Sequence, residues 1–365
     1  MKIGFFDFTR EISAIGQDVQ DAVNKVICSG RYILGKQLQG FEDKFACFCS
    51  VGRAVGVASG TDAIFLGLKA LGVGPGDEVI TTAHTFAATG LAILYTGAKP
   101  VFVDIEKDSY LIDVTLIEKA VTAKTKAIIP VHLYGLCADM DPIMDMAAFH
   151  GLSVLEDACQ AHGAFYKDRP AGSIGHIGAF SFYPTKNLGA YGDAGAIVTN
   201  DSDLYERLTL LRNYGQVDKY HHEAAGYNSR LDEIQAAILS VKLDHLKDWV
   251  KKRQEIASRY NEGLGELDLV RQKVQPGCTH AYHLYVLACH DRDGLQAFLK
   301  ERGIDTLIHY PVPLHRQKAF FGMYVSGVLP DTELRAGQVL SLPMHPWLQD
   351  HEIDYVIDCI REFLA

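Results

Sequence analysis

Short apolar segments rich in β-branched residues recur through the first part of the chain and predict the strands of one sheet. They lie at 54–58, 78–82, 100–104, 127–131, 152–157, 178–183 and 194–199. Stretches of helical character separate several of these segments, at 62–71, 86–95 and 139–150. This alternation is typical of a mostly parallel sheet that is covered by helices on both faces. The predicted fold class is therefore α/β.

The later part of the chain has a different pattern. From Asp232 onward, apolar residues recur every three to four positions, which predicts one long helix with a single buried stripe. A strand at 283–287, a helix at 294–302 and an amphipathic terminal helix follow, and together they indicate a smaller α+β domain. We expect the boundary near 245–262, which gives a large domain of residues 1–245 and a small domain of residues 246–365.

Composition and charge narrow the function classes. Of the 365 residues, 48% are apolar and 22% are charged, the balance of an ordinary globular protein. The net charge of −10 opposes binding to nucleic acid, and no block of Lys and Arg compensates for it. No apolar run approaches the length of a membrane span, and the N-terminal residues do not resemble a signal peptide. A cytoplasmic protein is expected.

Eight cysteines are scattered along the chain, which favours reduced, mostly buried thiols over a disulfide framework. Cys47 and Cys49 lack both the spacing of a zinc knuckle and a matching second pair. No metal site is therefore expected.

One segment has the features of a phosphate cradle. Ser59, Gly60 and Thr61 follow the strand at 54–58 and open the helix at 62–71, where free N–H groups and the helix dipole favour an anion. The alternative is that these residues only cap the helix. The glycine-rich segment 72–76 follows a helix and precedes a strand, so it is interpreted as a turn.

Two further residues are candidates for chemistry. Asp157 ends an apolar strand at the carboxyl edge of the predicted sheet, where α/β proteins bind their ligands. A buried carboxylate there needs a cationic partner, although Asp157 could equally cap the segment that follows. Lys186 lies in a loop between Pro184 and Gly189, just after Ser181. A single lysine in a loop is normally solvated, so Lys186 alone indicates no function.

Together these segments resemble a known family. The motifs SGTDA (59–63), TF (85–86), EDACQAHG (156–163), SFYPTKNLG (181–189), GDAG (192–195) and GYNSRLDEIQA (226–236) occur in the order of the nucleotide-sugar aminotransferases of the DegT/DnrJ/EryC1/StrS type. The sequence resembles that family over essentially its whole length. The resemblance implies the type I fold of pyridoxal-phosphate (PLP) transferases, which is the fold of aspartate aminotransferase.

The resemblance also implies roles for individual residues. Lys186 would form the Schiff base with PLP, and Asp157 would face the pyridine nitrogen. A carboxylate at that position keeps the nitrogen protonated, so the ring can accept electrons when a proton leaves the substrate carbon. The other implied cofactor contacts are Phe86 on the ring, Gln160 at the phenolic oxygen, Gly60, Thr61 and Ser181 at the phosphate, and Asn228 at the phosphate of a neighbouring subunit.

Structural alternatives stay open for these residues. Phe86 could belong to the core, Ser181 could be a strand hydroxyl, and Gln160 and Asn228 could be turn residues. His162 could approach the cofactor or could equally be a hydrogen-bonded core histidine.

The family's chemistry predicts a ping-pong transfer from glutamate to a nucleotide-linked keto sugar. The chain looks most like the branch that aminates carbon 3, with a dTDP-linked 3-keto-6-deoxyhexose as the acceptor. In that interpretation Lys219 pairs with the diphosphate, and Tyr183, His309 and Tyr310 bond the sugar hydroxyls. Lys219 could instead be a surface charge, and the segment around His309 a loop that packs on the second domain. A homodimer with shared active sites is expected.

Three other functions compete with this one. Amination at carbon 4 uses the same cofactor motifs. The related sugar dehydratases replace the lysine by histidine, so Lys186 disfavours dehydration. A non-catalytic sugar-nucleotide binder or regulator could keep the fold, but Lys186 together with Asp157 argues against it.

Overall fold

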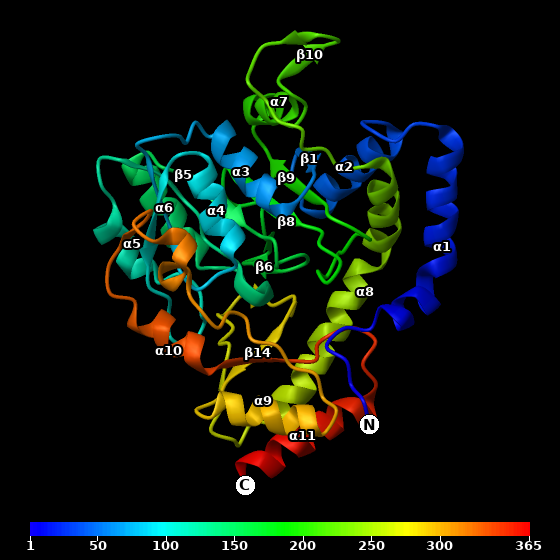
Figure 1. The fold of residues 1–365 in the computed structure, drawn as a ribbon, viewed down its shortest axis with the longest axis vertical. Coiled ribbons are helices and arrows are strands. Elements are labelled where there is room, and N and C mark those ends of the chain that lie inside the picture. Colours follow the sequence, from blue (N-terminus) through cyan, green and yellow to red (C-terminus); the bar gives the residue numbers. More distant parts are fainter.

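A single eight-stranded sheet forms the centre of the molecule (Figure 1). The computed structural model describes residues 1–365, apart from the side chain of Ser326. In spatial order the strands are β1 (Arg53–Val57), β9 (Gly195–Thr199), β8 (Ile177–Ser181), β5 (Ser153–Asp157), β4 (Thr125–Ile128), β2 (Glu78–Thr82), β3 (Lys99–Val103) and β15 (Val325–Ser326). The seven strands expected from the sequence are confirmed, and β15 is an additional edge strand from the later part of the chain.

The strand directions bring the carboxyl ends of several strands to one edge of the sheet. From β8 to β15 every neighbouring pair is parallel, whereas β9 runs antiparallel to both β8 and β1. Because β9 opposes both of its neighbours, β1 points the same way as the parallel strands. The carboxyl ends of β1, β2, β5 and β8 therefore meet at a single edge, as expected for a mostly parallel sheet.

Helices cover both faces of this sheet. One face carries α3 (Gly60–Ala70), α4 (Ala87–Tyr95) and α7 (Ser202–Leu211), and the other carries α2 (Lys36–Phe48), α5 (Val114–Ala120), α6 (Met140–His150) and α8 (Glu233–Gly263). Side chains alternate between the two layers: Val55 and Ile197 pack with the first set of helices, and Ala54 and Val198 with the second. Burial of both faces explains the continuous apolar character of the strands.

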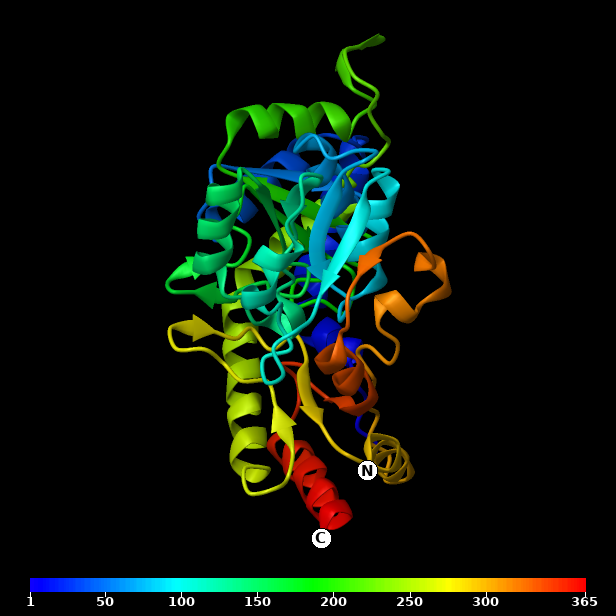
Figure 2. The ribbon, with the colours of Figure 1, turned by 90° about the vertical axis from the view of Figure 1, so that its left-hand side faces the viewer.

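The end of the chain builds a second, smaller core. A three-stranded antiparallel sheet lies against two helices and the far end of α8 (Figures 1 and 2). Its elements are β12 (Val270–Arg271), β14 (Tyr285–Ala288), α9 (Arg292–Glu301), β16 (Val339–Leu342) and α11 (Asp350–Leu364). Along α8, Val250 packs in the core of the large sheet, and Ile256 packs in the smaller core. The division of the chain into domains 1–245 and 246–365 stays a prediction.

Shorter elements complete the chain. They are α1 (Phe8–Ser29), the strands β6 (Phe165–Tyr166), β7 (Arg169–Pro170) and β13 (Cys278–Thr279), the hairpin of β10 (Gln216–Asp218) and β11 (His221–His222), α10 (Pro330–Gln338), and the 3₁₀ turns η1 (Leu133–Gly135), η2 (Leu314–Arg316) and η3 (Lys318–Phe320). The β10–β11 hairpin projects from the body of the molecule beyond α7 (Figures 1 and 2).

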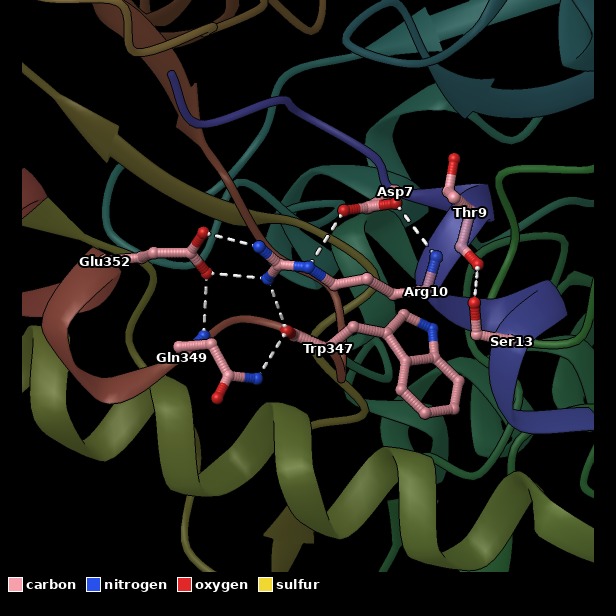
Figure 3. Close-up of polar contacts among 7 residues, drawn as sticks. All are labelled: Asp7, Thr9, Arg10, Ser13, Trp347, Gln349 and Glu352. Atoms are coloured by element: carbon pink, nitrogen blue, oxygen red, sulfur yellow. Dashed lines mark hydrogen bonds and ion pairs between the residues drawn. The ribbon is translucent and has the colours of Figure 1, made fainter. Parts of the chain in front are cut away.

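An ion pair ties the start of α1 to the start of α11 (Figure 3). The Arg10 guanidinium donates to both carboxylate oxygens of Glu352, at 2.8 and 2.7 Å, and also to the Trp347 carbonyl at 2.8 Å. Glu352 in turn accepts the N–H of Gln349, which caps α11. This bidentate contact fixes the N-terminal segment on the small core.

The described helices include none that is long and apolar enough to cross a membrane. All eight cysteines carry free thiols.

Candidate active site

A cavity of about 490 Å³ opens at the edge where β1, β2, β5 and β8 end. Ten of the twelve residues that the sequence suggested for a site line this cavity: Gly60, Thr61, Phe86, Asp157, Gln160, Ser181, Tyr183, Lys186, His309 and Tyr310. They come from segments that are far apart in the chain. The parallel topology therefore brings the sequence motifs together in one place.

The first turn of α3 forms one wall of the cavity. Ser59 caps the helix, because its hydroxyl accepts the N–H of Asp62 at 3.1 Å. Gly60 packs so closely on the end of β8 that a Cβ there would lie 2.5 Å from the Cβ of Ser181. This approach brings the unpaired N–H groups of the helix start to the cavity beside Thr61 and Ser181. Such a site suits an anion.

Asp157 lies at the carboxyl end of β5 with a buried side chain. Its Oδ2 accepts the Thr89 hydroxyl at 2.7 Å, and its Oδ1 accepts the N–H of Cys159 at 3.2 Å. Thr89 is itself hydrogen-bonded to Thr85, at 3.0 Å. These contacts hold the carboxylate at the cavity wall.

Lys186 projects into the cavity from the loop between β8 and β9. The loop is fixed at Lys186, whose N–H donates to the Tyr183 carbonyl at 2.8 Å, and at Asn187, whose amide donates to the Ala281 carbonyl at 2.8 Å. Burial lowers the pKa of the Lys186 amine, although the nearby Cys159 and Asp157 act in the opposite direction. Lys186 is therefore not the solvated loop lysine that its local sequence alone would indicate.

Gln160, Tyr310 and Phe86 form a second wall. Gln160 accepts the N–H of Tyr134 at 2.8 Å and donates to the Tyr310 hydroxyl at 3.0 Å. The Phe86 ring lies 5.7 Å from the Tyr310 ring, measured between centroids, and 55% of Phe86 is exposed. An aromatic side chain this open at a cavity has a face available for a planar ligand.

Two histidines line the cavity, and a third does not. Burial and then the charge of Lys186 lower the pKa of His309 to about 4, and the same two causes lower the pKa of His283 well below its usual range. Both rings are therefore neutral at pH 7. His162 lies in the core, 5.3 Å from the ring of Phe180 and 5.6 Å from that of Phe182. The geometry thus agrees with the core alternative for His162.

Lys219 and Asn228 lie apart from the cavity of their own chain. Lys219 is exposed at the tip of the β10–β11 hairpin, where its ammonium lies 5.3 Å from the centroid of the Tyr220 ring. Asn228 is exposed at the base of the excursion that carries this hairpin, where its backbone forms an isolated β-bridge with Asn213. The roles suggested for these two residues stay predictions.

Several cavity residues were not found from the sequence. Thr89 contacts Asp157, and Cys159 and His283 also line the wall. Thr85 lies just before α4 and Thr89 lies in its first turn, so the two are not on one regular helix face, and no sequence pattern indicated Thr89. For His283 no local signal exists, because it comes from the small core.

Comparison with known proteins shows what the chain is similar to. The model of the DegT/DnrJ/EryC1/StrS aminotransferase family matches residues 13–361. The dTDP-3-amino-3,4,6-trideoxy-alpha-D-glucose transaminase of Streptomyces venezuelae is 47% identical over 364 residues, which are 99% of this chain and 96% of that protein. The pleiotropic regulatory protein of Geobacillus stearothermophilus is 47% identical over 368 residues, covering 100% and 99%.

Solved structures agree with this result over the whole chain. Streptomyces venezuelae DesV in complex with a ketimine intermediate has a TM-score of 0.97 at 47% identity, and the match covers 100% of this chain and 99% of that one. Bacillus subtilis NtdA with the bound cofactor PMP has a TM-score of 0.93 at 34% identity, covering 100% and 85%. The predicted α/β aminotransferase fold is thereby confirmed. The chain belongs to the DegT/DnrJ/EryC1/StrS aminotransferase family.

Proposed function

We propose that this protein is a PLP-dependent aminotransferase that moves an amino group from glutamate to a nucleotide-linked keto sugar. The acceptor proposed is a dTDP-3-keto-6-deoxyhexose, which gives a dTDP-3-amino-3,6-dideoxyhexose. The observation that carries the proposal is the convergence of Lys186, Asp157 and the first turn of α3 on one cavity. An amine, a carboxylate and an anion site there match the aldehyde, the pyridine nitrogen and the phosphate of PLP.

The residues present fit this cofactor. The phosphate would lie at Gly60, Thr61 and Ser181, at the start of α3, which the missing Cβ of Gly60 allows to approach the end of β8. Lys186 would bond the aldehyde carbon, and Asp157 would face the pyridine nitrogen. Phe86 would cover the ring, and Gln160 would donate to the phenolic oxygen.

The cofactor, when bound, supplies a ring that takes up the electron pair left when a proton leaves the substrate carbon. Asp157 would face the pyridine nitrogen, and the Thr89 hydroxyl and the Cys159 N–H keep its carboxylate in place. Lys186 moves the proton through its Nζ. Its lowered pKa raises the share of neutral amine near pH 7, and only the neutral amine accepts a proton.

We propose that the active enzyme is a homodimer in which each protomer completes its partner's site. The support is the position of Lys219 and Asn228, which lie on an exposed excursion outside their own cavity. In the dimer, Lys219 would pair with the substrate diphosphate and Asn228 with the cofactor phosphate of the partner's site. The cytoplasmic location expected from the sequence also stays a proposal.

The choice of carbon 3 rests on similarity. The Streptomyces venezuelae relative is named for a dTDP sugar that has its amino group at carbon 3. Within the cavity, Tyr183, His309 and Tyr310 supply hydroxyl and imidazole groups that would bond the sugar hydroxyls. A site built from such groups rejects isomers that leave them unpaired.

A second candidate is a regulatory role, because the Geobacillus stearothermophilus relative is named a regulatory protein. Binding a sugar nucleotide does not require a lysine in the cavity near a buried aspartate. Lys186 and Asp157 therefore favour the enzyme.

The experiment that tests the proposal offers ¹⁵N-glutamate to the PLP-loaded protein with 3-keto and 4-keto dTDP sugars in separate reactions. NMR of the product should find the label on carbon 3. Turnover of the 4-keto sugar alone would overturn the carbon-3 assignment, and no label in any sugar would overturn the proposed transfer.

A further inference from the structure

Tyr134 is a fully buried tyrosine behind the cavity wall, and it does not line the cavity itself. It lies in the 3₁₀ turn η1 and contacts the wall at two points. Its backbone N–H donates to Gln160 Oε1 at 2.8 Å, and its hydroxyl donates to the carbonyl of His309. One residue of η1 thus contacts both Gln160 and the segment that carries His309 and Tyr310.

The hydroxyl of Tyr134 donates one hydrogen bond and accepts another, and the two roles are fixed by its partners. A carbonyl can only accept, so Tyr134 must donate to His309 and must accept from His84, whose Nε2 lies 2.9 Å from it. Burial lowers the pKa of His84 to about 4, so the ring is neutral at pH 7 and carries one N–H. Among the described residues, Nδ1 of His84 has no partner, which agrees with the hydrogen on Nε2.

The backbone N–H of Tyr134 fixes the orientation of the Gln160 side-chain amide. Because Gln160 Oε1 accepts the Tyr134 N–H, the NH₂ group of Gln160 must be the end that points to Tyr310. It donates to the Tyr310 hydroxyl at 3.0 Å. The phenolic oxygen of Tyr310 thereby accepts, and its own hydrogen has no acceptor among the residues described. That hydrogen is left for a ligand in the cavity.

We propose that Tyr134 is a positioning residue that presents Tyr310 as a hydrogen-bond donor to an oxygen of the acceptor sugar. The inference rests on the proposed function and adds a determinant of acceptor recognition to it. The Tyr134 hydroxyl sets where the His309–Tyr310 segment lies, and its N–H sets which way Gln160 is turned. A sugar with an oxygen opposite Tyr310 is bound, and an analogue without that oxygen leaves the donor unpaired.

The test compares Tyr134→Phe with Tyr110→Phe. Both substitutions remove one hydroxyl from a buried ring, and the two rings are neighbours with centroids 6.1 Å apart. The Tyr110 hydroxyl donates to the Val270 carbonyl at 3.2 Å, away from the cavity, so Tyr110→Phe is the matched control. Calorimetry with the dTDP amino sugar measures the Kd for each protein, and steady-state kinetics separates KM from kcat.

Tyr134→Phe should weaken amino-sugar binding about tenfold and raise the acceptor KM by a similar factor, while the half-reaction with glutamate changes less than about twofold. Tyr110→Phe should leave all of these quantities near the wild-type values. In a Tyr310→Phe background, Tyr134→Phe should add little, because the donor that it positions is already gone.

Equal sugar binding by Tyr134→Phe and Tyr110→Phe would overturn the positioning role. So would a full additional loss in the Tyr310→Phe background, which can be measured even where the single variant is less stable. If the wild-type protein neither binds nor aminates any keto-sugar nucleotide, the proposed function fails, and this inference fails with it.

Discussion

Two neighbouring acidic residues in β5, Glu156 and Asp157, have side chains in different environments. Asp157 faces the cavity, whereas Glu156 is fully buried. One carboxylate oxygen of Glu156 accepts from His132 Nε2 and from the N–H of Gly172, both at 2.8 Å. Its other oxygen accepts the N–H groups of Ile174 and Gly175, both at 2.6 Å. Successive side chains of a strand point to opposite faces, so neighbours in sequence acquire different functions.

This difference predicts two distinct phenotypes. Asp157→Asn should slow the half-reaction with glutamate at least about a hundredfold, because the group proposed to face the pyridine nitrogen loses its charge, while the melting temperature changes little. Glu156→Gln should cost about 2–3 kcal/mol of unfolding free energy, because an amide NH₂ replaces one acceptor oxygen. Stopped-flow absorbance and thermal melts measure the two effects. A Glu156→Gln protein that is slow in the glutamate half-reaction but as stable as the wild type would contradict this division of roles.

Sequence patterns located the chemical groups at the residue scale but not the groups that hold them. Lys186 and Asp157 were found because motifs surround them. Thr89 and Tyr134 were missed because their contacts, with Asp157 and with the His309 carbonyl, join segments that are distant in sequence. Such partners follow only from the tertiary packing.

At the scale of elements, prediction worked where the hydrophobic pattern is continuous. The seven buried strands and α8 were predicted because each has a clear apolar run or stripe. The first helix, α1, was missed although Ile15, Val19 and Val26 form a buried stripe along it. The edge strand β15 has only two residues, and its pairing with β3 depends on contacts across the whole chain. No local pattern could have indicated it.

The contact between α1 and α11 predicts a pH-dependent stability. The hydrogen bonds from Arg10 lower the pKa of Glu352 from its ordinary value of 4.5 to about 2 in the folded protein. A depressed pKa stabilises the fold above the unfolded value and loses that effect as the pH falls from about 4.5 toward 2.

Glu352→Gln should therefore destabilise the protein by about 1–2 kcal/mol at pH 7, since Arg10 is partly exposed. The difference from the wild-type melting temperature should shrink as the pH is lowered through this range. Lys44→Gln is the matched control, because its ion pair with Asp244 is exposed on both sides and should have little effect at any pH. A constant difference between pH 7 and pH 3 would contradict the assignment.

At the scale of the molecule, two of the expected site residues, Lys219 and Asn228, lie on the projecting excursion and do not line the cavity of their own chain. The homodimer proposed here supplies them from the partner. Mixing Lys186→Ala and Asn228→Ala chains, each inactive alone, should restore activity, because a mixed dimer holds one site with both residues intact. Random pairing of equal amounts should give about a quarter of the wild-type rate.

The control for that experiment is proof of subunit exchange, for example by mass spectrometry of differently labelled chains. Exchange without recovered activity would show that each site is built from one chain.

The measurement that tests the account most directly is the location of the covalent link to the cofactor. Borohydride reduction of the PLP-loaded protein, followed by peptide mapping, should find a single pyridoxyl group on Lys186. Its position in the cavity beside Asp157 and Cys159, and its lowered pKa, set it apart from the exposed lysines. A label on any other lysine, or no label on a protein that binds PLP, would contradict the account.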